Sequence, residues 1–126
     1  MRYLLAGLWF SLLVCGIANA HEMTPTYPQF SNAFVPGVLK TNMEIFNKRE
    51  DVSYYEIGAF DGEWNAIPFV TSYKVIKMEY LAHAQFDIYI KAEDKKRLMY
   101  ICSKSKLTKD TVKSSAIASR ICSKVK

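Results

Sequence analysis

Two histidines give this sequence its most specific opportunity for metal chemistry. His21 follows the tripeptide Ala18-Asn19-Ala20, and signal peptidase requires small side chains at the first and third positions before its cut. Cleavage there would free the α-amino nitrogen of His21 next to its ring nitrogen, and copper favours such nitrogen donors. His83 is the other histidine in the chain, so a small copper-binding protein using His21 and His83 is one alternative function. The main prediction is a protein with no metal and no other cofactor.

Residues for hydrolytic catalysis do not assemble into a known arrangement. The sequence contains neither a Gly-x-Ser-x-Gly nor a His-Glu-x-x-His motif. Glu56, Asp61 and Glu63 cluster near Trp64, where paired carboxylates could serve a sugar site, but a turn between strands is the simpler explanation. We therefore expect a protein that is not an enzyme.

The cysteines predict one disulfide bond. Cys15 would leave with a signal peptide, and Cys102 and Cys122 would remain as an even pair. An oxidising compartment should join them.

Four aromatic residues suggest a protein-binding surface. Tyr54, Phe60, Trp64 and Tyr89 fall on the strand faces opposite to the predicted core positions. Exposed aromatic side chains mark interaction surfaces, although a two-sheet fold can also bury such residues.

The elements that must position these residues are short β-strands. Residues 21–36 contain Pro25, Pro28 and Pro36 and should form at most an interrupted edge strand. Apolar residues at every second position then predict half-buried strands in several places. The predicted strands are residues 38–47, 52–60, 64–70 (a short edge or sheet-switching strand), 75–80, 86–90, 98–103 and 117–125.

The connections between these strands are also predicted from sequence. Residues 86–90 and 98–103 lie so close that we expect them to pair antiparallel across the polar connection 93–96. Residues 104–115 form a long polar loop, and a Cys102–Cys122 bridge would tie the last strand to its neighbour. About seven short antiparallel strands with little helix predict an all-β, immunoglobulin-like β-sandwich.

The N-terminal twenty residues predict export. Arg2 precedes an apolar run from residue 3 to 14, which is shorter than the about 20 residues of a membrane-spanning helix. The sequence thus predicts a signal peptide at 1–20 and one domain at 21–126. An uncleaved anchor and a lipoprotein modified at Cys15 are the alternatives. We expect a secreted or periplasmic protein with no transmembrane segment after cleavage.

The charge balance gives only weak information about partners. The chain carries 17 Lys and Arg against 12 Asp and Glu, a net charge of +5, and loss of Arg2 leaves +4. Many of these cations lie in the C-terminal part, where they could face an acidic surface or keep the protein soluble. With no nucleic-acid motif in an exported chain, we do not expect nucleic-acid binding.

The order of features between Val38 and Ser105 resembles the N-terminal immunoglobulin-like domain of periplasmic pilus-assembly chaperones. The resemblance rests on a strand ending at Asn47, the pair Tyr54-Tyr55, the segment Ile67-Pro68-Phe69, and the alternating Phe86-Asp87-Ile88-Tyr89-Ile90 that leads to Tyr100. It implies the fold of such chaperones, in which one strand donates apolar side chains to a pilin. The basic residues that anchor the pilin C-terminus in that family match no position in this sequence.

The main functional hypothesis is an exported, non-enzymatic protein-binding or structural module. It would engage another protein through its sheet edges and exposed aromatic residues. Besides copper binding, the second alternative is an accessory component of a pilus or virus particle.

Overall fold

The computed structural model describes residues 21–106 and 118–126. The predicted signal peptide, with Ala18 and Ala20 of its cleavage site, lies outside the described residues, as do most of the predicted polar loop and Ile117 of the last predicted strand.

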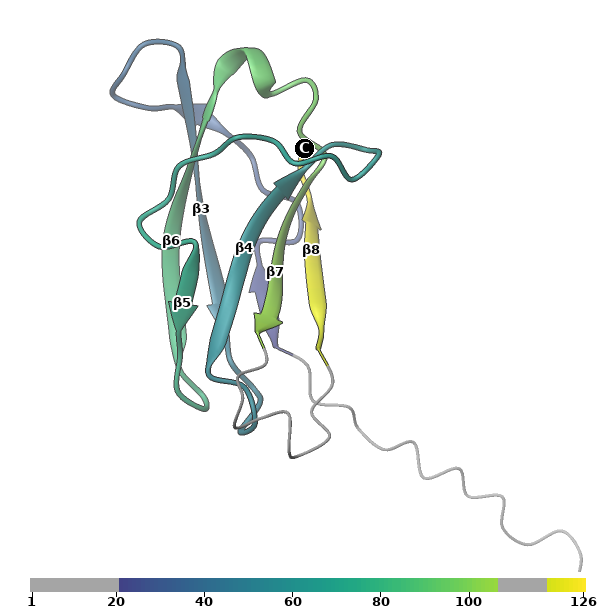
Figure 1. Cartoon of the computed structure of the whole chain (residues 1–126). Coiled ribbons are helices and arrows are strands. Elements are labelled where there is room, and N and C mark those ends of the chain that lie inside the picture. Colours follow the sequence, from purple (N-terminus) through teal and green to yellow (C-terminus); the bar gives the residue numbers. More distant parts are fainter. Residues whose placement is uncertain (1–20, 107–117) are drawn as a thin grey trace, which may run out of the picture.

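The described residues form two antiparallel sheets that face each other (Figure 1). The first sheet, sheet A, contains β1 (Glu22–Thr24), β2 (Ser31–Asn32), β3 (Val38–Phe46) and β6 (His83–Lys91). The second, sheet B, contains β4 (Tyr54–Phe60), β5 (Val75–Lys77), β7 (Tyr100–Lys106) and β8 (Arg120–Lys124). A single turn of 3-10 helix, η1 (Ala92–Asp94), follows β6. The predicted all-β, immunoglobulin-like sandwich is confirmed.

The core lies between the sheets and is built from the predicted alternation of side chains. Residues at every second position of β3, β4 and β6 are buried, while their neighbours are wholly or partly exposed. Side chains on the two inner faces of a sandwich interdigitate in this way. The buried residues of these strands include Met43 and Ile45, then Tyr55, Ile57 and Ala59, and then Phe86, Ile88 and Ile90.

The expected hairpin between residues 86–90 and 98–103 is wrong. β6 pairs along its whole length with β3 in sheet A, whereas β7 pairs with β4 in sheet B. The connection contains η1 and buries Asp94 and Leu98, and it carries the chain from one sheet to the other. This connection is longer than a tight hairpin loop, and it spans the about 10 Å that separates packed sheets.

Residues 64–70 cross between the sheets without forming the predicted strand. Ala66 makes an isolated bridge to Phe60 of sheet B, and Val70 makes one to Tyr89 of sheet A. Pro68 lies between the two bridges and has no N–H group to continue a ladder, which explains why no strand forms. The predicted strand at 75–80 is likewise shorter, because only Val75–Lys77 pairs with β4.

Asn47 joins three segments at the end of β3. Its buried amide nitrogen donates hydrogen bonds to the carbonyls of Val52, Met78 and Glu79, at 2.9, 3.3 and 3.2 Å. Its side-chain oxygen accepts one from the Tyr55 hydroxyl at 2.5 Å. Burial raises the pKa of Tyr55 to about 12, so this hydroxyl keeps its proton and remains a donor. The hydrogen bonds fix the turn that leads from sheet A to sheet B.

The predicted disulfide is present between Cys102 of β7 and Cys122 of β8. The two cysteines are direct cross-strand partners, so the bond ties the last strand to sheet B.

Replacing Cys102 and Cys122 together by serine should lower the free energy of unfolding by about 3 kcal/mol, because the bond closes a loop with a sequence separation of 20. Urea unfolding of the variant and of the wild-type protein measures the difference. Wild-type protein under reductant is the control and should show the same loss. Equal stability of all three samples would contradict a structural role for the bond.

Candidate functional site

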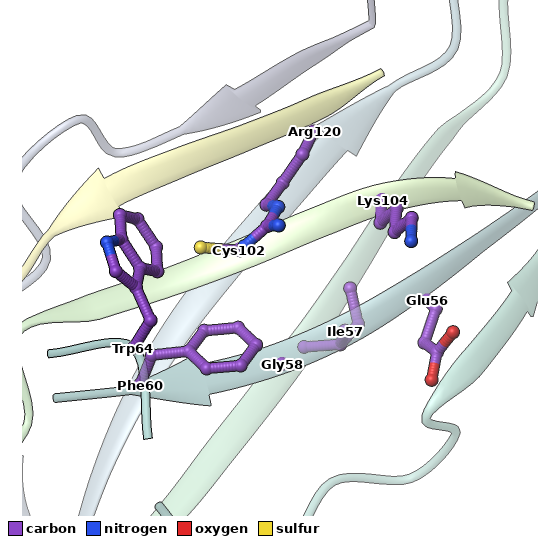
Figure 2. Close-up of a pocket in the computed structure, with 8 residues that line it drawn as sticks. All are labelled: Glu56, Ile57, Gly58, Phe60, Trp64, Cys102, Lys104 and Arg120. Carbon is purple, nitrogen blue, oxygen red and sulfur yellow. The ribbon is translucent and has the colours of Figure 1, made fainter. Parts of the chain in front are cut away.

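The outer face of sheet B carries a trough that runs across its strands. Gly58 of β4 pairs with Cys102 of β7, which pairs in turn with Cys122 of β8. Gly58 has only a hydrogen in place of a side chain and the two cysteine side chains are short, so this row forms a low floor. Gly58 and Cys102 of this floor, together with the walls, line a hollow of about 550 Å³ (Figure 2).

Aromatic rings form one wall of the trough. Phe60 and Tyr100 are cross-strand partners in the row next to the floor. The Trp64 ring stacks on Tyr100 with ring centres 4.7 Å apart and lies tilted against Phe60 at 6.0 Å. Phe60 also leans back over Gly58, where an added Cβ would lie only 2.7 Å from the ring. Glycine at position 58 is therefore what allows the ring to lie there.

A tight turn holds Trp64 above this wall. The Asp61 carboxylate accepts hydrogen bonds from the backbone N–H groups of Glu63 and Asn65, at 2.8 and 2.9 Å. The bonds from Asn65 are the main cause of the lowered pKa of Asp61. Trp64 itself has a φ of +67°, a left-handed conformation that is uncommon for a bulky residue. The cluster of Asp61 and Glu63 is therefore a turn that positions Trp64.

Charged residues form the other wall. Glu56, Lys104 and Arg120 share the row on the far side of the floor. The Arg120 guanidinium lies 5.3 Å from the Trp64 ring centre and 5.8 Å from that of Phe60, so this side chain extends across the trough (Figure 2). Glu56 lies 3.5 Å from Lys106, which is outside the hollow.

The structure brings together only part of the predicted aromatic surface. Phe60 and Trp64 belong to the trough, and Trp64 is 50% exposed. Tyr54 lies on the same face at the other end of β4, whereas Tyr89 lies on the outer face of sheet A. The four residues do not form one continuous surface, because β4 and β6 belong to different sheets, and protein binding by them stays a prediction.

Sequence reasoning missed Tyr100 and Arg120 as members of the site. The period-two pattern of residues 100–104 contains a signal for Tyr100, because it places this ring on the same face as Cys102 and Lys104. The same period-two spacing places Arg120 on the face of Cys122, but its neighbours across the sheet follow only from the register of β8 with β7.

The two histidines proposed for copper lie on opposite faces of sheet A. His21 is 1% exposed and packs between the sheets, where its Nε2 lies 2.8 Å from the Ser103 hydroxyl and its Nδ1 lies 3.3 Å from that of Ser119. His83 is exposed, stacks on Phe46 and lies with Nδ1 2.5 Å from Glu44. The described part of the chain contains no group of three or more His, Cys, Asp or Glu that could hold a metal ion. Copper binding by His21 and His83 stays a prediction, and this arrangement does not bring them together.

Comparison with known proteins gives similarity in fold but none in sequence. No family model and no curated protein matches the chain. Among solved structures, the E. coli chaperone DraB matches with a TM-score of 0.58 and 9% identity, over 84% of this chain and 53% of the chaperone. The periplasmic chaperone SfaE matches with a TM-score of 0.54 and 15% identity, over 84% of this chain and 56% of the chaperone. The chain therefore spans about half the length of these proteins.

The resemblance to periplasmic pilus-assembly chaperones is thus confirmed at the level of the fold. In addition, none of the helices in residues 21–106 and 118–126 is long and apolar enough to cross a membrane.

The burial of His21 predicts a pH-dependent stability. Burial is the largest cause of the lowered pKa of His21, and the positive charge of Arg49 lowers it further. The unfolded chain therefore takes up a proton near the ordinary value of 6.5, while the folded chain does so only at lower pH. The free energy of unfolding should therefore fall as the pH drops from 7 through 6.5 toward the lower pKa of the folded chain. It should rise again as the pH is increased.

Urea unfolding between about pH 7 and pH 5 measures this dependence. His21→Gln should flatten the decline, because it removes the imidazole whose pKa is lowered by burial. A decline that is identical in the wild-type protein and in His21→Gln would show that other groups cause it.

Proposed function

We propose that this chain is an exported, non-enzymatic module that binds another protein through the trough of sheet B. The observation that carries the proposal is the half-exposed Trp64, held by stacking on Tyr100 above an open hollow. The fold that the chain shares with the chaperones DraB and SfaE supports a protein-binding role. The signal-peptide pattern of residues 1–20 supports export.

A rigid tryptophan is well suited to protein recognition. Tryptophan and tyrosine contribute a large contact area at low cost in side-chain entropy, and they are enriched among the residues that dominate binding energy. Trp64 is already ordered by the Asp61 turn, by Tyr100 and by Arg120. Little conformational freedom would then be lost when a partner covers it.

Two of the sheet edges are partly covered by other backbone segments. The backbone N–H groups of Lys124 and Lys126 donate to the carbonyls of Thr26 and Pro28, which occupies the C-terminal half of the β8 edge. Val70 pairs in the same way with Tyr89 on the edge of β6. These contacts hinder the addition of a partner strand along those stretches of β8 and β6. A role as an accessory component of a pilus or virus particle would require co-purification with the assembly in fixed stoichiometry.

Replacing Trp64 by alanine should reduce capture of the protein partner by about tenfold or more, because truncation of a central aromatic residue costs 2 kcal/mol or more in typical interfaces. Affinity capture from a periplasmic extract of the natural host, followed by quantitative mass spectrometry, compares the variant with the wild-type protein. The unfolding midpoint should remain nearly the same, since Trp64 lies outside the core.

Tyr73→Ala is the matched control, because Tyr73 is 72% exposed and does not line the trough. It should capture the partner as well as the wild-type protein does. Unchanged capture by Trp64→Ala, or a large fall in its stability, would contradict the proposed function.

A further inference from the structure

Resting on the proposed function, we infer that the partner segment in the trough is acidic. It would place a carboxylate side chain against Arg120 and Lys104, and an adjacent apolar side chain against Trp64 and Phe60. The inference depends on three features of this face: its excess of positive charge, the fixed position of Arg120, and the aromatic wall beside it.

The outer face of sheet B is strongly cationic. Strand register places on this face the cations Lys77, Lys104, Lys106, Arg120 and Lys124 against the single anion Glu56. Glu56 pairs with Lys106. Among the described residues, neither Arg120 nor Lys104 has a carboxylate within ion-pair distance. The two cations that line the hollow are therefore available to a ligand, and they attract a negatively charged one.

Arg120 is held in a position that suits a carboxylate. Its guanidinium lies over the rings of Trp64 and Phe60, 5.3 and 5.8 Å from their centres, within range of the attraction between a cation and an aromatic ring. A guanidinium carries five N–H donors in a planar fork, and the attraction of its charge to a ring does not consume them. Those groups match the two oxygens of a carboxylate, and such charge-assisted pairs are stronger than neutral hydrogen bonds.

The aromatic wall favours a protein segment over an anionic membrane. A charged lipid surface is recognised chiefly by clustered basic residues. In the trough, however, the cations stand beside Trp64 and Phe60 around a hollow that is floored by Gly58 and Cys102. A hollow of this kind accepts individual side chains, and the adjoining aromatic and cationic walls match an apolar residue next to an acidic one.

A random dodecapeptide display library, selected on the purified exported protein, tests the inference. Peptides that bind the wild-type protein but not Trp64→Ala should be enriched in Asp or Glu next to aromatic or aliphatic residues. In titrations with the selected peptides, Arg120→Gln and Lys104→Gln should each weaken binding by about tenfold. Lys77→Gln is the matched control on the same face, and it should change binding little because Lys77 does not line the hollow.

The other outcomes separate this inference from the proposed function. Selected peptides that need Trp64 but are neutral or basic would overturn the acidic partner and leave the protein-binding trough in place. If no peptide depends on Trp64, both fail. In that case, Trp64-dependent binding of anionic phospholipid vesicles would identify a membrane surface as the ligand instead.

Discussion

The register of β4, β7 and β8 is the constraint on which both the core and the trough depend. Side chains alternate between the two faces of a strand, so burying Tyr55, Ile57 and Ile101 between the sheets forces their neighbours to the outside. If the strand register slipped by one residue, these apolar side chains would be exposed and the charged side chains of the outer face would be buried. The hydrophobic energy of the core therefore also determines that Gly58 and Cys102 meet on the outer face. The disulfide to Cys122 covalently fixes the same register on β8.

The proposed binding properties follow from three adjacent rows on this face. The side chains of the middle row project little from the sheet, because this row consists of Gly58 and the Cys102–Cys122 disulfide. One flanking row is aromatic and the other is charged, and Arg120 joins the two walls through its contacts with Phe60 and Trp64. The face is therefore ordered before any partner arrives, which reduces the entropy lost on binding. A similar fold occurs in the chaperones DraB and SfaE. The chain spans only about half of their length.

Features that depend on local periodicity could be predicted from the sequence. The alternation in β3, β4 and β6, the fold class and the pairing of Cys102 with Cys122 all follow from residue types at fixed spacing. The pairing of β6 with β3 could not be predicted in this way, because it depends on whether the connection turns back within one sheet or crosses to the other. Chain length alone leaves both possibilities open.

The candidate site was only partly predictable for the same reason. Phe60 and Trp64 are close in sequence, and both belong to the trough. Arg120 comes from a distant strand and reaches them only through sheet register, while Tyr89 is separated from them because β6 lies in the other sheet. The burial of His21 against Ser103 likewise depends on how the two sheets pack. The alternation of residues within one strand carries no information about that packing.

The central claim is that Gly58, Phe60, Trp64, Tyr100 and Arg120 form one ordered surface, and nuclear magnetic resonance tests this most directly in the free protein. We expect an upfield ring-current shift of the Gly58 Hα protons, because the Phe60 ring lies over this glycine. We also expect nuclear Overhauser contacts from the Trp64 indole to the Tyr100 ring and to the Arg120 side chain. Gly58 Hα shifts at ordinary strand values, together with no contact between Trp64 and Tyr100, would contradict the register and the trough built on it.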